Sequence, residues 1–410
     1  MISPLGDNDT MNGMTKYGNP YRPGAAVSPL YLAGRDREQS RFASLLRGAP
    51  AIPANLRLTG LRGVGKTVLL KNLEQLALQA GWMTSRVQLE PRHNREDEVA
   101  GLIRDVAHNA ILRISKVERA RDAVRQAAAV LSTVRVSWQD IELSMTPRTS
   151  PGSPQIAKSL YDVVSAAVRG GHRGYLLMLD EAQVLRDERG GVQTHPLSLL
   201  VAAVNTLQEY SVPLGLVLSG LPSLTANLLR ARTYTERMFR GEEIGRLDEP
   251  AALEAFTRPL DETGMTAEPE LVQRVVSEVE GFPYFIQLWG AELWDGAREA
   301  GAARLTPDLL DAIEPDIYRR LDIDFYGGRV EALTPAEQDL LVGAADCPYP
   351  PLRTSDVQSK THRSTGNVNV LMGRLVEQGV LYRLQKGAYG YTAPKFHEYL
   401  RRRAARRLEP

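Results

Sequence analysis

The chain has 410 residues, with an apolar content of 43% and a charged content of 24%, which are ordinary values for a soluble protein of two to four domains. No apolar run approaches the ~20 residues of a membrane helix, and a single cysteine excludes an internal disulfide, so we expect a cytoplasmic protein with no membrane partner. The net charge of +1 hides an asymmetry, because residues 350–410 hold 12 Lys and Arg against 4 Asp and Glu. This basic end is expected to meet a polyanion or an acidic surface.

The first 30 residues are rich in Gly, Pro, Asn and Ser and show no periodicity, so we expect a flexible N-terminal arm over residues 1–30. A nucleotide-binding core is expected over residues 31–248. It opens with an amphipathic helix that carries Phe42, Leu45 and Leu46 and is broken by prolines before the first strand.

A phosphate-binding loop is predicted where the sequence GLRGVGKT, from Gly60 to Thr67, joins a short strand at residues 56–59 to a helix at residues 68–80. Glycines let consecutive backbone N–H groups point at one anion, and the helix N-terminus adds its positive dipole end. Lys66 is expected to reach the β- and γ-phosphates, and the Thr67 hydroxyl to hold Mg²⁺. The expected nucleotide contacts are Gly60, Gly63, Val64, Gly65, Lys66, Thr67 and Val68.

The middle of the core is predicted to continue with a strand at residues 86–89, a long helix over residues 96–131 and a small β-hairpin over residues 134–145. One face of this hairpin is apolar. It packs on the core or contacts DNA or another partner. A further helix is expected over residues 156–168.

An unbroken apolar run from Tyr175 ends in Asp180 and Glu181. A run without alternation indicates a strand buried on both faces, hence a parallel sheet covered by helices, and ligands bind at the carboxyl ends of such strands. Asp180 is expected to hold the Mg²⁺ that Thr67 also touches, and Glu181 to orient and deprotonate the attacking water. The alternative is an acidic helix cap after a core strand.

A third buried strand, residues 214–218, ends at Ser219, which either senses the γ-phosphate or is simply a turn residue. A helix over residues 225–240 follows and carries four arginines, and an edge strand is expected at residues 243–247. An exposed arginine there, with Arg237 as our candidate, would act as an arginine finger on the nucleotide of a neighbouring subunit. The alternative is that these arginines are only solvated charges.

From Glu249 the pattern becomes helical, and residues 249–330 are predicted to form a small helical lid beside the nucleotide site. A last domain, residues 331–410, opens with a capping box formed by Thr334 and Glu337. Three helices followed by a hairpin are the order of a winged helix-turn-helix, whose second helix turns outward for DNA.

If this domain binds double-stranded DNA, Asn367, Asn369 and Arg374 are expected to face a major groove, with Arg363 and Lys386 near phosphates. The alternative is that the winged helix serves only for packing or regulation. The C-terminal arginines, at positions 401–403 and 406–407, either grip phosphates or complement the dipole at a helix C-terminus.

Taken together, these motifs resemble those of AAA+-type ATPases, in the branch that contains the origin-recognition initiators and the STAND signalling ATPases. The resemblance rests on Gly34 and Arg35, the GLRGVGKT loop, Leu179-Asp180-Glu181, Leu218 to Pro222, the helical lid and the winged helix. It implies an α/β fold with a five-stranded parallel sheet, ATP and Mg²⁺ as cofactors, and self-association on binding ATP. Gly34, Arg35 and Pro283 are nucleotide contacts that the resemblance adds.

The lid departs from the initiator pattern, which has an arginine three residues after a glycine. Counted from Gly281, that position is Tyr284. The segment Gly281-Phe-Pro283 instead resembles the Gly-x-Pro motif of STAND proteins, which implies slow turnover and switch behaviour. Ser219 also replaces the asparagine that is frequent at its position.

Two functions remain open on the sequence alone. The first is an ATPase that assembles as a homo-oligomer on binding ATP and holds DNA through its winged helix. The second is a STAND-like switch, held with ADP as an inactive monomer, whose partner is another protein.

Overall fold

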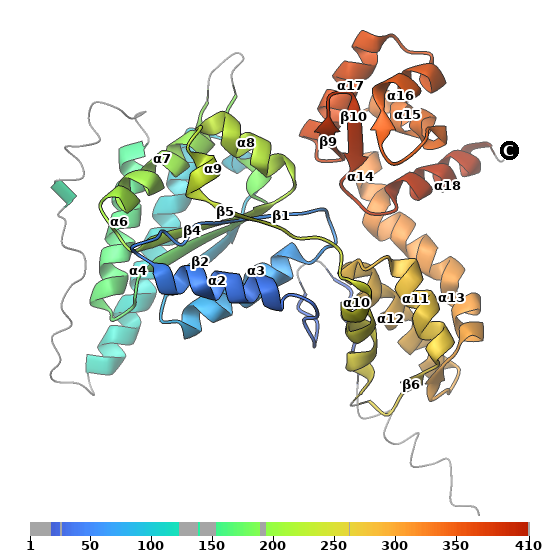
Figure 1. Ribbon diagram of the computed structural model, residues 1–410, viewed down its shortest axis with the longest axis horizontal. Helices are drawn as coiled ribbons and strands as arrows, with labels where there is room; N and C mark the ends of the chain where they lie inside the picture. The colour runs from blue at the N-terminus through green and yellow to red at the C-terminus, as the bar shows by residue number, and fades with distance from the viewer. Residues whose placement is uncertain are drawn as a thin grey trace, which may run out of the picture. The chain divides into compact units, whose positions relative to one another are not determined.

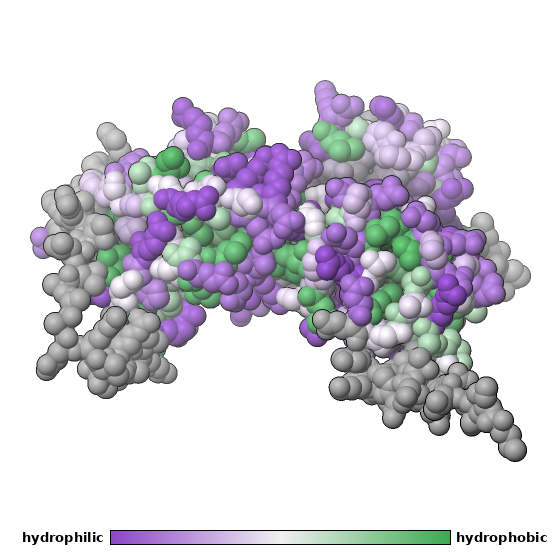
Figure 2. Space-filling view, turned by 60° about the horizontal axis from the view of Figure 1, so that its bottom comes forward, coloured by the Kyte–Doolittle hydropathy of each residue, from purple (hydrophilic) through white to green (hydrophobic). Residues whose placement is uncertain are grey.

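The computed structural model describes residues 18–24, 27–122, 138–139, 153–188, 194–261 and 263–408. The hairpin predicted over residues 134–145 lies outside these ranges except for Trp138 and Gln139, which are helical. Within the described ranges, none of the helices has the length and apolar character required to cross a membrane. The visible surface is mostly hydrophilic, with apolar side chains in separate patches (Figure 2).

The chain divides into two compact units (Figure 1). The core unit comprises Arg35–Gly60 and Lys66–Ile244, and the C-terminal unit comprises Met1–Gly34, Leu61–Gly65 and Gly245–Pro410. The division thus falls at Gly245, and the segments that we expected as separate lid and winged-helix domains form one unit. The phosphate-binding loop changes unit at both of its ends.

A five-stranded parallel sheet forms the centre of the core unit, in the order β2-β3-β4-β1-β5. Its strands are β1 (Leu56–Thr59), β2 (Met83–Gln88), β3 (Tyr175–Asp180), β4 (Leu214–Gly220) and β5 (Arg240–Glu243). Every residue of β3 and β4 is buried, as the unbroken apolar runs predict. The predicted α/β fold with a parallel sheet is confirmed.

Helices cover both faces of this sheet. Tyr175, Leu177 and Leu179 of β3 belong to one apolar core with helices α4 (Glu96–Asp122), α6 (Ser153–Arg169) and α7 (Pro196–Glu209). Leu176 and Met178, which alternate with them, are equally buried and lie outside that cluster. The other face is covered by α2 (Asp36–Gly48) and α3 (Lys66–Gln79) (Figure 1).

The prediction of one helix over residues 225–240 is wrong for the second half of that range. Helix α8 (Ser223–Ala231) ends at Arg232, which is extended, and a separate turn, α9 (Thr235–Met238), follows. The Thr235 hydroxyl bonds the carbonyl oxygens of Leu228 and Arg232 and stabilises this break. Arg240 consequently begins β5, so the edge strand starts three residues earlier than predicted.

The first part of the C-terminal unit is a helical bundle. Its helices are α10 (Glu249–Thr257), α11 (Pro269–Val279), α12 (Pro283–Glu299), α13 (Pro307–Arg320), the π-helix η4 (Leu321–Gly327) and α14 (Gly328–Glu331), with a two-stranded sheet of β6 (Thr266–Ala267) and β7 (Arg304–Leu305). Asp248 caps α10 and Thr306 caps α13, each through a side-chain oxygen that accepts a backbone N–H.

The described part of the N-terminal arm is packed on this bundle, which corrects our expectation of a flexible segment there. Tyr21 is 3% exposed, stacks on Phe256 and donates its hydroxyl to the Phe256 carbonyl oxygen. Gly290 makes room for it, since a Cβ there would lie 2.4 Å from the Tyr21 ring. The Asn19 amide donates to the Ala291 carbonyl oxygen at 3.0 Å.

The rest of the unit has the element order of the predicted winged helix. It contains α15 (Pro335–Gly343), α16 (Thr354–Thr361), α17 (Thr365–Glu377) and α18 (Phe396–Leu408), with an antiparallel sheet in the order β8 (Leu352–Arg353), β10 (Ala388–Tyr391), β9 (Leu381–Gln385). The capping box between Thr334 and Glu337 is present, and Ser364 caps α17.

Candidate nucleotide-binding site

Three polar side chains meet at the carboxyl edge of the core sheet. The Thr67 hydroxyl, at the start of α3, donates to Asp180 Oδ2 at 2.6 Å. The Ser219 hydroxyl, near the end of β4, donates to Asp180 Oδ1 at 2.8 Å. Asp180 is 2% exposed and Ser219 is fully buried, so both hydrogen bonds hold the carboxylate in one orientation. The sequence predicted each of these residues, and the structure brings all three together.

This donor set fits Mg²⁺ held partly by a nucleotide. Mg²⁺ prefers oxygen ligands and usually takes only one or two carboxylates from the protein, with phosphates and water completing its shell. Among the described residues there is no group of three or more His, Cys, Asp and Glu side chains that could hold a metal alone. Thr67 and Asp180 are therefore the residues that would hold the ion, with phosphate oxygens supplying the remainder.

Glu181 follows Asp180 in a left-handed backbone conformation, with φ of 55°. A non-glycine residue in this region is strained by roughly 1–3 kcal/mol, and such strain concentrates at functional sites. Its backbone N–H donates to Asp180 Oδ1 at 3.0 Å, and its carboxylate accepts a hydrogen bond from the Gln183 side chain. The turn thus places a second carboxylate beside the buried one, oriented by an amide.

Sequence reasoning missed Gln183, which joins the site residues to β4. Its Oε1 atom accepts from the Leu221 backbone N–H at 3.0 Å. A Cβ at Gly220 would lie 2.4 Å from that oxygen, so a side chain there would displace the Gln183 amide. The Gly60 N–H donates to the Gly220 carbonyl oxygen at 3.2 Å, which fixes the start of the phosphate-binding loop to the end of β4. A polar residue two positions after the acidic pair was the signal available.

The phosphate-binding loop requires its glycines for conformational reasons. Gly63 and Gly65 have φ of 79° and 86°, which L-residues rarely adopt. Lys66 is 8% exposed and begins α3, followed by Thr67 and Val68 in its first turn, while Val64 is buried. The loop therefore has the sequence, helix position and backbone that a phosphate cradle needs.

Residues 61–65 of this loop contact other parts of the C-terminal unit. The Tyr284 N–H donates to the Gly63 carbonyl oxygen at 3.2 Å, and the Arg62 N–H donates to the Thr392 carbonyl oxygen at 2.9 Å. Pro283, at the start of α12, lies 3.8 Å from a Cβ built on Gly65. The lid proline that the resemblance singled out is thus next to the loop, and Tyr284 occupies the place of the initiator arginine.

Gly34 and Arg35 lie on either side of the division between the units. Gly34 has φ of 61°, and a Cβ there would lie 2.7 Å from the Ala251 Cβ in α10. Arg35 precedes α2, is 5% exposed and pairs with Glu38 at 3.6 Å. Burial lowers the pKa of Arg35 against the opposing effect of Glu38. Their contact with a nucleotide stays a prediction.

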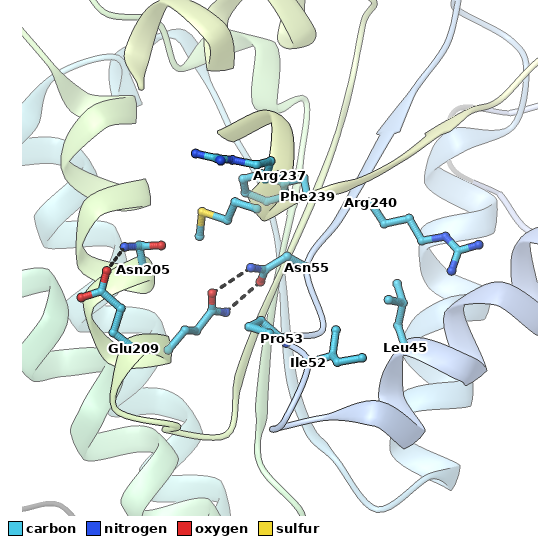
Figure 3. Close-up of a pocket in the computed structure, with 11 residues that line it drawn as sticks. Leu45, Ile52, Pro53, Asn55, Asn205, Glu209, Arg237, Phe239 and Arg240 are labelled. Atoms are coloured by element: carbon cyan, nitrogen blue, oxygen red, sulfur yellow. Dashed lines mark hydrogen bonds between the residues drawn. The ribbon is translucent and has the colours of Figure 1, made fainter. Parts of the chain in front are cut away.

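Arg237 lies at the amino edge of the core sheet, away from the Asp180 cluster. It is exposed, and it lines a cavity of about 420 Å³ together with Asn55 and Arg240 (Figure 3). The Arg240 N–H donates to the Asn55 carbonyl oxygen just before β1, whereas the phosphate-binding loop follows the other end of β1. The structure thus does not bring Arg237 to the site residues of its own core unit.

Two groups of cations in the C-terminal unit bear on the predicted DNA contacts. Arg402 and Arg406 pair with the buried carboxylate of Asp322 at 2.5 Å and 3.0 Å, and Lys395 pairs with Glu278 at 2.6 Å. The second group lies on α16, α17, β9 and their flanks, and none of its members is within salt-bridge distance of a described carboxylate. It consists of Arg353, Lys360, Arg363, Arg374, Arg383 and Lys386.

A phosphate-binding loop that opens α3, with an acidic pair at the end of β3, defines a P-loop nucleotide-binding domain. Residues 31–218 match the model of the AAA ATPase domain, and residues 324–400 match a family described only as a domain of unknown function. Residues 31–218 are therefore similar to a AAA ATPase domain, in agreement with the P-loop motifs. No curated protein matches the chain.

Three solved structures resemble the chain over most of its length. The ADP form of the Aeropyrum pernix ORC2 protein has 12% sequence identity and a TM-score of 0.51, and the match covers 94% of this chain and 97% of that one. This match shows a shared fold. The Aeropyrum pernix ORC1 protein in complex with DNA has 17% sequence identity and a TM-score of 0.46, and the match covers 93% of this chain and 95% of that one. The Thermotoga maritima RuvB Holliday junction branch migration motor has 14% sequence identity and a TM-score of 0.42, and the match covers 90% of this chain and 95% of that one.

Proposed function

We propose that this protein is a slow, Mg²⁺-dependent ATPase that assembles with its own copies on binding ATP and holds duplex DNA through its winged helix. The observation that carries the ATPase part is the buried Asp180 carboxylate, oriented by Thr67 and Ser219 and followed by the strained Glu181. This arrangement supports in-line transfer of a phosphoryl group to water.

Each residue has a separate task in this proposal. The Lys66 ammonium and the backbone N–H groups of the loop bind and orient the phosphates. Thr67 and Asp180 hold Mg²⁺, which when bound neutralises the charge that develops on the phosphoryl oxygens. Glu181 orients the water and accepts its proton, and Gln183 sets the direction of the Glu181 carboxylate. Ser219 acts by positioning Asp180.

The contacts of residues 61–65 support a link between the nucleotide and the winged helix. Thr392 follows β10 directly, is 1% exposed, and receives the Arg62 N–H while its hydroxyl bonds the Gly379 carbonyl oxygen. A change in the loop backbone on nucleotide binding is therefore expected to shift Thr392 at the base of the β9–β10 hairpin. This coupling is how we propose that ATP controls the DNA-binding part.

Charge supports DNA as the partner of the winged helix. The six cations without a carboxylate partner lie on α16, α17, β9 and their flanks, whereas Arg402 and Arg406 both pair with the Asp322 carboxylate. Unpaired cations on one surface are the electrostatic footprint of a polyanion-binding site. The arrangement favours phosphate contacts from Arg363, Arg374 and Lys386 over contacts from Arg402 and Arg406.

Assembly is supported by Arg237, which lies at the opposite edge of the sheet from the Asp180 cluster. The described structure gives its guanidinium neither a hydrogen bond nor an ion pair, and the residue is exposed. A guanidinium placed there acts on a nucleotide only if that nucleotide belongs to another copy. The proposal therefore requires a homo-oligomer in the active state.

A STAND-like switch is the second candidate, favoured by the position of Pro283 next to Gly65 and by the tyrosine, Tyr284, at the position of the lid arginine. In that function the Thr392 contact holds the loop closed on ADP, and the partner is a protein.

Light scattering on the Glu181→Gln protein, with ATP or ADP and with or without duplex DNA, separates the two candidates. A large assembly that needs both ATP and DNA is the expected result. An ATP-driven assembly that ignores DNA favours the switch, and a monomer under all conditions contradicts the role of Arg237.

A further inference from the structure

Helix α17 presents an outward face that its own chain leaves without a partner. Its inward residues, Val368, Leu371, Met372 and Leu375, are buried. The opposite face carries Gly366, Val370 and Gly373, which recur at helical spacing, with Asn369 beside them, and it ends at the exposed Glu377 in the last turn. The Val370 side chain is 55% exposed, although an apolar side chain gains nothing from water at such a position.

The amide groups on this helix are available for hydrogen bonds to a partner. Asn367 Oδ1 accepts from the Arg363 guanidinium at 3.2 Å, which leaves the Asn367 NH₂ group free to donate. The Asn369 side chain has no hydrogen bond within the described part of the chain, so its donor and acceptor are both open. A paired donor and acceptor on one side chain is the pattern that matches adenine in the major groove.

Charge complementarity identifies the occupant of this face as a nucleic acid duplex. Arg363 and Arg374 lie on or just before α17, and Arg383 and Lys386 lie on and just after β9, all without a carboxylate within salt-bridge distance among the described residues. A protein partner with an apolar groove would not need four such cations on α17, β9 and the residues beside them. The phosphates on both sides of a DNA groove would bind such cations.

The two glycines agree with a close approach by that duplex. A Cβ built on Gly366 or on Gly373 meets nothing within 4 Å, so packing within the chain does not require glycine at either position. Glycine inside a helix is destabilising relative to alanine. Open space beside Val370 lets base edges come nearer to the helix backbone than longer side chains would allow.

We propose that α17 reads an A·T base pair in the major groove, with Val370 against a thymine methyl group and Asn369 on adenine. This inference rests on the proposed DNA-binding function and adds sequence specificity to it. The methyl group of thymine is the one apolar feature of the major groove, and it therefore explains an exposed valine amid amides and arginines.

The test begins with selection of duplexes from a random pool by the full chain with Mg²⁺ and ATP, followed by replacement of each selected thymine with uracil. Uracil keeps the base pairing and removes only the methyl group. At one or two positions the replacement should weaken binding by roughly fourfold, the value of one buried methyl group. The same replacement should have no effect on Val370→Ala.

Further variants separate this idea from a general loss of structure. Ile323→Ala, at a residue 66% exposed in η4, should leave the uracil effect intact. Gly373→Ala should raise thermal stability yet weaken binding to the selected duplex, a pair of effects that a purely structural glycine cannot produce. Asn369→Ala should reduce the preference for adenine at the paired position.

The possible failures are distinguishable. If the wild-type chain binds no duplex in a salt-dependent manner, the proposed DNA-binding function is wrong and this inference is wrong with it. If the chain binds duplex DNA but selects no sequence, or if uracil costs nothing at any position, base reading by Val370 is overturned and DNA binding stands.

Discussion

At the scale of single residues, the site depends on how Asp180 is held. Ser219 is fully buried and donates to the carboxylate on the side opposite to Thr67. We expect Ser219→Ala to leave Asp180 with one unmade hydrogen bond, to raise the Mg²⁺ concentration needed for half-maximal ATPase activity several-fold, and to lower kcat by roughly tenfold. A titration of activity against Mg²⁺ checks this. An unchanged Mg²⁺ requirement with a lost preference for ATP over ADP would instead make Ser219 a γ-phosphate sensor.

Glu181 gives the second prediction at this scale. Glu181→Gln keeps the shape of the side chain and its hydrogen bond to Gln183 but removes the general base. ATP should therefore remain bound, and turnover should fall by about 10²–10⁴-fold. Single-turnover hydrolysis and equilibrium ATP binding measure the two effects separately. Lys66→Ala is the contrasting variant, because it should abolish nucleotide binding itself; normal ATP binding by that protein would refute the phosphate-binding loop.

Residues whose role follows from local sequence were predictable, and residues whose role depends on a distant partner were not. The spacing within the phosphate-binding loop predicted the roles of Lys66 and Thr67, and the acidic end of an apolar strand predicted the role of Asp180. Ser219 was identified, but its acceptor was visible only in the fold. Gln183 had only a weak signal, and the pairing of Arg402 with Asp322 joins residues 80 positions apart. No pattern in either segment indicates such a pair.

At the scale of elements, the core sheet was predictable because strands buried on both faces have unbroken apolar runs. The helix over residues 225–240 was overextended because periodicity continues through Arg232, and only the bonds of Thr235 to carbonyl oxygens reveal the break. The arm around Tyr21 was misjudged for a similar reason. Its composition is that of a flexible segment, but one tyrosine finds a site over Gly290 that tertiary structure creates.

The contact between α11 and the start of α18 gives a prediction about pH. Burial alone would raise the pKa of Glu278, but hydrogen bonds from Lys395 and Tyr318 outweigh it, and the pKa lies below its ordinary value of 4.5. A lowered folded-state pKa means that ionised Glu278 stabilises the fold above the unfolded-state pKa, and this stabilisation is lost as the pH falls through the folded-state value.

Glu278→Gln should therefore lower the Tm by about 2–4 °C near pH 7, and this effect should shrink as the pH falls below 4.5 towards the folded-state pKa. Thermal unfolding of both proteins from pH 7 to pH 3 measures the difference. The matched control is Glu299→Gln, at an exposed position of α12, which should show no such difference. A Glu278→Gln effect that stays constant over this pH range would mean that packing, and not charge, accounts for it.

At the scale of the whole molecule, the position of Arg237 bears on whether one copy of the protein can hydrolyse ATP without a second copy. Because Arg237 lies at the amino edge of its own sheet, Arg237→Ala should lose the 10³–10⁵-fold acceleration of an arginine finger only where copies assemble. Glu181→Gln has an inactive site and an intact Arg237. Mixing equal amounts of the two variants should restore about a quarter of the wild-type rate, since one interface in four then joins an intact Glu181 to an intact Arg237.

The control for this experiment is Arg240→Ala, which changes a second arginine lining the same cavity. It should retain activity, because Arg240 belongs to β5 and its side chain already lies 3.3 Å from Glu242. Steady-state ATPase rates measured across a range of mixing ratios give a bell-shaped curve if Arg237 acts in trans. A straight line between the rates of the two pure variants would show that each copy hydrolyses ATP without its neighbour, and the homo-oligomer would then have to serve DNA binding alone.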